Sequence, residues 1–329
     1  MPDVFISTVP FGAIDPHPVQ LLENAGLSYL INPLGRKLKA GEIGALIREV
    51  KVLVAGTELI GEQDIAQARE LRLISRVGIG LDGVDLGAAR DYGVAVSYTP
   101  DAPSPAVTEL TMGLILDLAR GITSADRRVR AGQWERYMGR RLSDLTIGVV
   151  GVGRIGFRVI RLLQQFGCAV LAHDIRTLPL LGPDLGVHWT DLPTLLAKAD
   201  IVSLHVPLDH RTQGLIGARE LALMKPDAAL INTSRGGIVD ETALYEALAS
   251  GRLRAAALDT YEEEPYHGPL CELDNIILTQ HMGSCTVDCR LRMEVEATEE
   301  AIRFLRGEPL HSPVPQECYP PASRSRKDD

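Results

Sequence analysis

The chain has 329 residues, of which 23% are charged, and a formal net charge of −9 at pH 7. This acidic balance argues against a nucleic-acid-binding groove. No run of residues approaches the roughly 18 apolar residues of a membrane span, and the N-terminus lacks the pattern of a signal peptide, so we expect neither. Five cysteines, an odd number in a long chain, predict reduced thiols and a cytoplasmic location.

The N-terminal part of the chain alternates short apolar runs with helical patterns, which predicts an α/β unit with a parallel sheet. A proline-rich segment, residues 99–105, follows it and is expected to interrupt regular structure. Strands are predicted at residues 4–7, 28–31, 52–55, 73–76 and 94–97, and helices at residues 18–25, 40–50, 61–68 and 86–91.

A second α/β unit is predicted beyond a linking helix. Residues 106–121 are apolar almost all round, which is typical of a helix buried between two larger bodies. Residues 122–141 form a polar arm, residues 287–306 a further helix, and the tail at residues 323–329 is expected to be disordered. Six strands in the second unit suit the doubly wound nucleotide-binding fold. They are predicted at residues 146–150, 169–173, 200–205, 228–232, 255–258 and 276–279.

The most informative motif is the glycine-rich segment GVGRIG at residues 151–156, which lies between a predicted strand and a helix. The first glycine permits a tight turn, the second lets backbone approach a pyrophosphate, and the third lets helix and strand pack closely. Asp174 ends the next strand, where a carboxylate binds ribose hydroxyls and repels a 2′-phosphate, so NAD is expected rather than NADP. The predicted cofactor contacts here are Gly151, Gly153, Arg154, Ile155, Gly156 and Asp174.

Polar residues follow four more strands of this unit. The carboxyl ends of parallel strands meet at one edge of a sheet, where ligands of doubly wound folds bind. These residues are therefore expected to converge on one crevice with the glycine motif. The predicted cofactor contacts among them are His205, Val206, Pro207, Thr212, Thr233, Ser234, Arg235, Asp259, His281 and Gly283.

Three of the side chains in this crevice suit hydride transfer to a 2-keto acid. Arg235 can bind a carboxylate through two parallel hydrogen bonds, and His281 can exchange a proton near neutral pH. Glu264 beside the imidazole would fix its tautomer. The plainer alternatives are that Arg235 pairs with a surface acid and that His205 forms a wall of the cofactor site without taking part in the reaction.

Three potential metal ligands recur every four residues, at His281, Cys285 and Cys289. On one continuous helix they would share a face and could bind zinc. The expected helix starts after His281, however, and a fourth ligand at suitable spacing is missing. We therefore expect no metal.

Together these residues resemble the D-isomer-specific 2-hydroxyacid dehydrogenase family, and within it phosphoglycerate-dehydrogenase-type chains. The resemblance implies two doubly wound parallel-sheet domains. An NAD-binding Rossmann domain, residues 100–285, would be inserted into a discontinuous flavodoxin-like substrate domain, residues 1–99 plus 286–329. The segments that carry the resemblance are residues 76–82, 99–107, 151–156, 232–240, 257–265 and 281–284.

The resemblance also implies roles for residues. Arg235 would bind the substrate carboxylate, His281 would act as acid and base, and Glu264 would be its partner. A homodimer would form through residues 106–141. The chain departs from the family's usual pattern at Gly83, Ser234 and Gln280. The implied substrate contacts are Gly56, Thr57, Val77, Gly78, Ile79, Arg235 and His281.

The expected function is NAD-dependent hydride transfer between nicotinamide and C2 of a small D-2-hydroxy acid or its 2-keto acid, with 3-phosphoglycerate as one candidate. A first alternative is a dehydrogenase of a phosphonate or a sugar-derived acid. A second alternative, from another class, is a non-catalytic NAD-sensing protein similar to a corepressor. Turnover of any 2-keto acid would separate the enzyme from the sensor.

Overall fold

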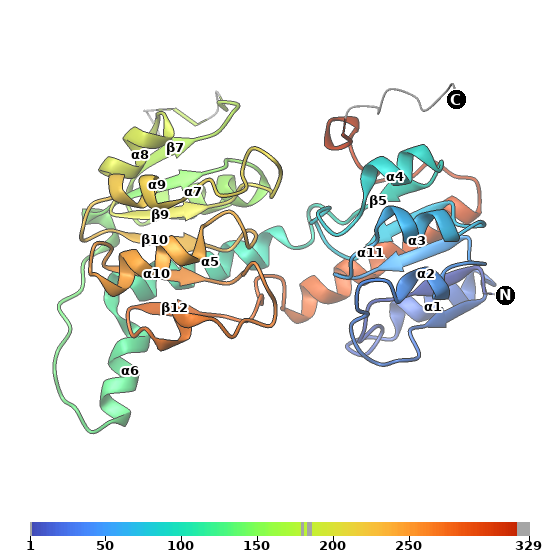
Figure 1. The fold of residues 1–329 in the computed structure, drawn as a ribbon, viewed down its shortest axis with the longest axis horizontal. Coiled ribbons are helices and arrows are strands. Elements are labelled where there is room, and N and C mark those ends of the chain that lie inside the picture. The colour runs from blue at the N-terminus through green and yellow to red at the C-terminus, as the bar shows by residue number, and fades with distance from the viewer. Residues whose placement is uncertain (1, 179–180, 183–185, 321–329) are drawn as a thin grey trace. The chain divides into compact units, whose positions relative to one another are not determined.

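The computed structural model describes residues 2–178, 181–182 and 186–320 (Figure 1). Its contacts divide the chain into two compact units. Unit 1 consists of Met1–Pro103 with Cys285–Asp329, and unit 2 consists of Ser104–Ser284. The tail predicted at residues 323–329 lies outside the described residues.

Unit 1 contains a five-stranded sheet in the order β2-β1-β3-β4-β5. Every neighbouring pair is parallel, and this order is that of flavodoxin-like folds. The strands coincide with the short apolar runs of the sequence, because strands covered on both faces need apolar side chains on both. Their bounds are β1 Val4–Ile6, β2 Tyr29–Ile31, β3 Val52–Ala55, β4 Leu73–Arg76 and β5 Ala95–Ser97.

Helices cover both faces of the unit 1 sheet. Phe5, Leu53 and Ile74 pack in one cluster with side chains of α2, α3 and α4. On the other side α11 contacts α1, β3 and β4, so the chain returns to this unit after unit 2 is complete. The bounds are α1 His17–Asn24, α2 Ile43–Leu46, α3 Glu62–Gln67, α4 Leu86–Asp91 and α11 Val287–Leu305.

The prediction of a helix over residues 40–50 was too long, since α2 has four residues. Gly41 has a φ of +81°, a left-handed conformation that a right-handed helix does not contain. The helix therefore begins only after this glycine.

Unit 2 contains a seven-stranded parallel sheet in the order β12-β11-β10-β9-β6-β7-β8. The order reverses beside β6, the arrangement of a dinucleotide-binding fold. Six strands were predicted. The missed one is β8, an edge strand whose middle residue, His188, is polar and exposed, so it lacks the apolar run that marks the other strands. The bounds are β6 Thr146–Val150, β7 Ala169–His173, β8 Val187–Trp189, β9 Ile201–Leu204, β10 Ala229–Asn232, β11 Ala255–Leu258 and β12 Ile276–Leu278.

Two hydrophobic clusters flank this sheet. Ile147 and Val149 belong to the cluster shared with α5 and α7, whereas Val150 and Leu204 belong to the cluster shared with α8, α9 and α10. Figure 1 shows where these helices lie around the sheet. The alternation along β6 is the period of two that a strand imposes on its side chains. The bounds are α5 Ser104–Arg120, α6 Ile122–Arg130, α7 Arg154–Gln165, α8 Leu192–Lys198, α9 Ala218–Leu223 and α10 Glu241–Ala249.

The prediction for the segment before α5 needs correction. The proline-rich segment at residues 99–105 is not wholly irregular, because α5 begins at Ser104 and carries Pro105 in its first turn. Proline is tolerated there, since N–H groups of the first turn have no partner within the helix.

Three short 3-10 helices complete the described structure, at Leu142–Asp144, Pro269–Glu272 and Gln316–Cys318.

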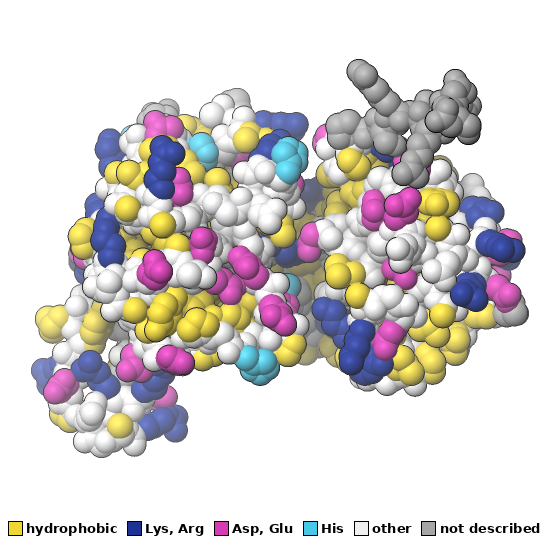
Figure 2. All heavy atoms as spheres, in the orientation of Figure 1, with side chains coloured by type: hydrophobic (Ala, Val, Ile, Leu, Met, Phe, Trp, Pro, Cys, Tyr) yellow, Lys and Arg dark blue, Asp and Glu magenta, His cyan; other side chains and the backbone are white. Residues whose placement is uncertain are grey.

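The polar arm also differs from expectation, because its first half is the helix α6. This helix buries none of its residues, and most of them are polar or charged. An ion pair between Asp126 and Arg130, one turn apart, supports it instead. Figure 2 shows basic side chains gathered over α6, whose own basic residues are all arginines.

In the part of the chain that the structure describes, no helix is both long enough and apolar enough to cross a membrane.

Candidate functional site

The glycine turn lies at the carboxyl end of β6 and leads into α7. Gly151 has a φ of +89°, and a Cβ added there would lie 2.6 Å from the carbonyl oxygen of His205. A Cβ on Gly156 would overlap the carbonyl oxygen of Gly151, whereas a Cβ on Gly153 would meet nothing within 4 Å. Two of the glycines are thus required by close packing, and the third leaves the backbone open to a ligand.

The start of α7 suits an anionic ligand. The helix begins at Arg154, next to the open backbone at Gly153, and Ile155 lies in its first turn. The first N–H groups of a helix have no partner within it and attract phosphate groups. The residues present therefore fit the pyrophosphate of a dinucleotide.

Asp174 lies beside this turn, directly after β7. Its Oδ2 accepts a hydrogen bond of 2.6 Å from the Val152 N–H, and its Oδ1 accepts one of 3.0 Å from the Arg176 N–H. The carboxylate therefore faces the glycine turn and helps to hold the turn in place.

His205 follows β9 on the other side of the glycine turn. Its Nε2 lies 2.9 Å from Ser203 Oγ, and its buried Nδ1 has no hydrogen-bond partner among the described residues. Burial lowers the pKa of His205 to about 4, so the ring is neutral at pH 7. The next residue, Val206, would touch a Cβ on Gly151.

The loop after β9 is closed by the Thr212 hydroxyl. It donates a hydrogen bond of 2.6 Å to the Pro207 carbonyl oxygen and accepts one of 2.8 Å from the Asp209 N–H. The hydroxyl therefore shapes the loop that carries the predicted cofactor contacts His205, Val206 and Pro207.

Arg235 lies in the turn after β10. Its Nη1 donates a hydrogen bond of 2.7 Å to the carbonyl oxygen of Ser234. Thr233 is buried, and its hydroxyl lies 2.9 Å from that of Thr111 on α5. A Cβ on Gly236 would overlap the Tyr261 carbonyl group, so this turn packs directly on the loop that leads to Glu264.

His281 and Glu264 form a direct pair. The Nδ1 atom of His281 lies 2.9 Å from each carboxylate oxygen of Glu264. The Tyr261 N–H donates a hydrogen bond of 3.3 Å to the same carboxylate. The imidazole and carboxylate side chains are 37% and 31% exposed, which leaves them accessible to a ligand.

Asp259 holds the loop that carries His281. It is buried, its Oδ1 accepts hydrogen bonds from Thr279 Oγ1 (2.6 Å) and the Met282 N–H (2.8 Å), and its Oδ2 accepts one from the Gly283 N–H (2.8 Å). Within this loop His281 has a φ of +50°, a conformation that non-glycine residues seldom adopt. Asp259 therefore bonds to residues on both sides of this unusual backbone position.

The predicted substrate contacts outside this group of loops belong to unit 1. The Gly56 N–H donates to Glu58 Oε1 at 3.0 Å, which leaves the Thr57 side chain exposed at the loop tip. In the second loop the Val77 N–H donates to the Ala55 carbonyl oxygen at 2.9 Å. These hydrogen bonds fix the shape of the first loop, residues 56–58, and connect its start to the start of the second loop, residues 77–80.

Arg76 is buried beneath the second loop. Its Nε and Nη2 donate hydrogen bonds to the Gly80 carbonyl oxygen, at 3.2 and 3.1 Å. The Gly78 N–H donates to Thr99 Oγ1 at 2.8 Å, and the next residue, Ile79, is half-buried. The guanidinium group therefore serves to shape the loop.

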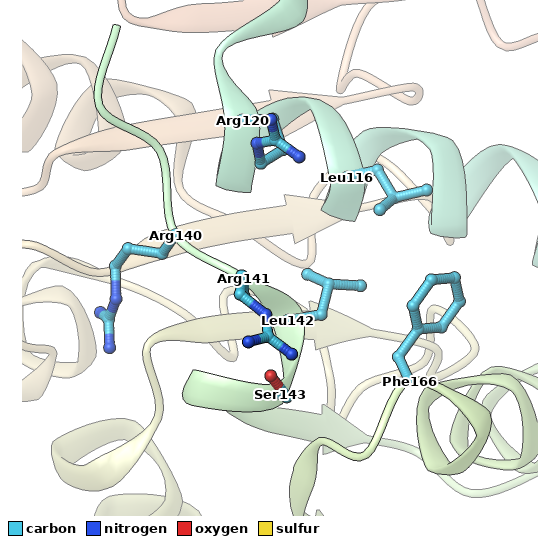
Figure 3. Close-up of a pocket in the computed structure, with 7 residues that line it drawn as sticks. All are labelled: Leu116, Arg120, Arg140, Arg141, Leu142, Ser143 and Phe166. Carbon is cyan, nitrogen blue, oxygen red and sulfur yellow. The ribbon is translucent and has the colours of Figure 1, made fainter.

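A separate cavity of about 230 Å³ lies between the end of α5 and the start of β6, lined by apolar residues, Ser143 and three arginines (Figure 3). It is at the amino ends of the strands, whereas the glycine turn and the residues around it are at the carboxyl ends. The cavity is therefore distinct from the candidate site. Among the described residues, no group of three or more His, Cys, Asp and Glu side chains could hold a metal ion.

Sequence reasoning assigned no role to several residues that shape this site. Ser203 contacts the His205 ring, and Thr279 and the Tyr261 N–H bind the carboxylates of Asp259 and Glu264. Asn232 is a further residue of this kind, and it is the one that the sequence could have indicated. An asparagine at the end of a strand commonly bonds to the backbone of the following turn.

Comparison with known proteins places these observations in context. A model of the NAD binding domain of D-isomer specific 2-hydroxyacid dehydrogenases matches residues 112–283. The chain is 38% identical over 296 residues to a D-3-phosphoglycerate dehydrogenase of Methanocaldococcus jannaschii, a match that covers 88% of this chain and 56% of the relative. It is 37% identical over 299 residues to a hydroxypyruvate reductase of Thermotoga maritima, covering 89% and 96% respectively.

A solved structure is also similar over nearly the whole chain. It is the D-lactate dehydrogenase of Aquifex aeolicus complexed with NAD and lactic acid, with a TM-score of 0.85 and 27% identity over 94% of this chain and 98% of that one. By contrast, the chain spans about half the length of the D-3-phosphoglycerate dehydrogenases that it matches.

Proposed function

Because the chain belongs to the D-isomer specific 2-hydroxyacid dehydrogenase family, we propose that it is an NAD-dependent oxidoreductase that interconverts a small D-2-hydroxy acid and its 2-keto acid. The predictions of the family, of the two parallel-sheet domains and of NAD as cofactor are confirmed. The observation that carries the proposed activity is the His281–Glu264 pair in the unit that also contains the glycine turn and Arg235.

The bound nicotinamide would supply or accept the hydride at substrate C2. Arg235 would bind the substrate carboxylate through its planar guanidinium group and so orient the reacting carbon. In the direction of reduction, His281 Nε2 would donate a proton to the oxygen that becomes the hydroxyl, and in oxidation it would take that proton back. Glu264 at Nδ1 would hold the ring and stabilise its protonated form.

The cofactor specificity proposed for the site is NAD rather than NADP. The Asp174 carboxylate lies against the glycine turn and would accept hydrogen bonds from ribose hydroxyls. A 2′-phosphate there would place like charges together.

For the substrate we propose a short, unphosphorylated acid such as hydroxypyruvate or glyoxylate. Hydroxypyruvate reductase and glyoxylate reductase are among the relatives that the chain matches over most of their length. A phosphorylated substrate would need a basic side chain at the substrate loops. Arg76, the arginine beside the predicted contacts Val77, Gly78 and Ile79, bonds to the Gly80 carbonyl oxygen instead.

The test is NADH oxidation, followed by absorbance, with glyoxylate, pyruvate, hydroxypyruvate, 2-ketoglutarate and 3-phosphohydroxypyruvate. We expect the highest kcat/KM with hydroxypyruvate or glyoxylate. A preference for 3-phosphohydroxypyruvate would replace this substrate with a phosphorylated one. NADH binding without turnover of any of these acids would contradict this substrate and favour one of the alternatives, a dehydrogenase of a phosphonate or sugar-derived acid or an NAD-sensing protein.

We further propose a homodimer formed through residues 106–141. The arm contains Trp134 and Met138, which are 85% and 87% exposed, and α6 contains the half-exposed Val129. Large apolar side chains exposed together on one segment are typical of an interaction surface. A second copy of the chain would cover them.

A further inference from the structure

Asn232, the last residue of β10, makes three side-chain hydrogen bonds to the turn that carries Arg235. Its Oδ1 accepts from the Ser234 N–H at 3.1 Å and from Ser234 Oγ at 2.7 Å. Its Nδ2 donates to the Arg235 carbonyl oxygen at 2.8 Å. The side chain is 1% exposed, so both ends of a fully buried amide are bound to the turn.

The backbone of Asn232 is itself fixed within the sheet. It is paired with Leu204 of β9 on one side and with Leu258 of β11 on the other, and its carbonyl oxygen accepts a hydrogen bond of 2.9 Å from the Asp259 N–H. The amide therefore connects the Arg235 turn to a strand that is hydrogen-bonded on both sides within a parallel sheet.

The opposite side of the turn is limited by a backbone contact. A Cβ on Gly236 would overlap the Tyr261 carbonyl group, so the turn cannot move toward the Glu264 loop. If the turn moved the other way, it would leave the buried amide of Asn232 without partners, which is costly in a protein interior. The Arg235 backbone is thus held from both sides.

We propose that Asn232 is a positioning residue that orients Arg235 for binding the substrate carboxylate. The proposal rests on the proposed function of Arg235. It predicts that loss of the Asn232 amide weakens recognition of the carboxylate more than it weakens the binding of NADH or the stability of the fold.

The alternative is that Asn232 only stabilises a strand end, and Asn275 provides the matched control. Its Nδ2 also donates two hydrogen bonds to backbone carbonyl oxygens, those of Leu248 and Arg254, both at 3.2 Å. It lies at the start of β12, at the amino edge of the same sheet, away from Arg235. Asn275→Ala therefore removes comparable bonds without touching the turn.

The main measurement is the ratio of kcat/KM for a 2-keto acid to kcat/KM for its uncharged methyl ester, with NADH as reductant. This ratio reports on carboxylate recognition and is insensitive to the fraction of folded enzyme. We expect Asn232→Ala to lower it by about ten- to hundredfold, the scale of effect expected when a substrate-binding group is displaced by about 1 Å. Asn275→Ala should leave the ratio unchanged.

Asn232→Asp separates the two halves of the amide. It keeps an acceptor for Ser234 but cannot donate to the Arg235 carbonyl oxygen, so the ratio should fall as it does in Asn232→Ala. A wild-type ratio in both Asn232 variants, or an equal fall in Asn275→Ala, would overturn the proposal.

A second measurement does not depend on turnover. Hydrogen exchange of a peptide spanning residues 233–237, in the full chain with NADH bound, should be faster in Asn232→Ala than in wild type and in Asn275→Ala. If the wild-type enzyme reduces no 2-keto acid, the proposed function fails, yet this experiment still tests whether Asn232 holds the turn. Unchanged exchange would show that it does not.

Discussion

At the scale of single residues, the side chains proposed to react are held mainly by backbone groups of short loops. Glu264 accepts a hydrogen bond from the Tyr261 N–H, and Asp259 accepts hydrogen bonds from the N–H groups of Met282 and Gly283. Because these contacts are local, exchanging one reacting side chain removes its chemistry while leaving the loop in place. Single substitutions can therefore separate the reaction from cofactor binding.

His281→Ala is expected to lower kcat by about two to four orders of magnitude, the usual contribution of a general acid and base. The dissociation constant of NADH should stay close to that of wild type. His267→Ala, which removes an exposed histidine of the same unit, is the control and should retain full activity. Steady-state rates and NADH fluorescence measure both, and an unchanged kcat in His281→Ala would remove this residue from the mechanism.

Asp174→Asn is expected to raise the kcat/KM ratio of NADPH to NADH by about tenfold or more. It removes the charge that repels a 2′-phosphate, an interaction of about 1–4 kcal/mol at 4 Å, but keeps an acceptor for the Val152 N–H. A second variant, Asp191→Asn, removes a charge at the N-cap of α8 and should leave the ratio unchanged. If both variants have the same effect on this ratio, a group other than Asp174 discriminates between the two cofactors.

At the scale of elements, the loops of the site meet through glycines that allow backbone to touch backbone. Gly151 packs against His205, and Gly236 packs against Tyr261. Such contacts fix the distance between neighbouring loops without any side chain between them. The glycines therefore determine the geometry of the site although they take no part in the chemistry.

Gly236→Ala tests this packing. Its methyl group would overlap the Tyr261 carbonyl group, so one of the two loops must move. We expect a loss of about 1–3 kcal/mol in the free energy of unfolding, the usual effect of overpacking, together with a large loss of activity. Gly113→Ala adds the same methyl group to α5, where nothing lies within 4 Å, and should be neutral or stabilising. Equal denaturation midpoints for the two variants would contradict the expectation.

Asp200 connects several elements at the amino edge of the unit 2 sheet. Although burial opposes its ionisation, hydrogen bonds from the Thr146 N–H, Lys225 and Arg140 keep the pKa of Asp200 below its ordinary value of 3.8. The folded state thus favours the ionised carboxylate more than the unfolded state does. This stabilisation is present above pH 3.8 and is lost as the pH falls through the lowered pKa of the folded state.

Asp200→Asn is therefore expected to reduce the free energy of unfolding at neutral pH and to make it less dependent on pH in the acid range. Denaturant titrations at several pH values measure both effects. The exposed Asp274 supplies the control, because Asp274→Asn should follow the wild-type curve. An unchanged acid dependence in Asp200→Asn would contradict the role given to its hydrogen bonds.

At the scale of the whole molecule, the chain forms unit 1, crosses to unit 2 at α5 and returns at α11. The strands of both units were predicted to within about one residue, because their apolar runs report burial directly. The helix α6 and the strand β8 were missed. The residues of α6 are mostly polar, and β8 has a polar, exposed residue at its centre.

The proposed homodimer also belongs to this scale. We expect a molar mass in solution of twice the 35.7 kDa of one chain, measured by light scattering. Replacing Trp134 and Met138 together by serine should shift the protein toward the monomer, because both side chains are exposed in the single chain. Replacing Ile14 and Leu34, exposed apolar residues of unit 1, is the matched control. A wild-type monomer would reject the proposal.

The sequence by itself determined the two α/β units, the glycine turn for NAD and the identity of Arg235, Glu264 and His281 as candidates. Apolar periodicity, glycine spacing and chemical type are local properties that can be read along the chain. Only the tertiary structure decided which other groups hold these candidate side chains in place. The bonds from Asn232 and Asp259 to their loops, and the packing of Gly236 on Tyr261, join residues through the folding of the sheet and its turns, where sequence patterns do not specify distance.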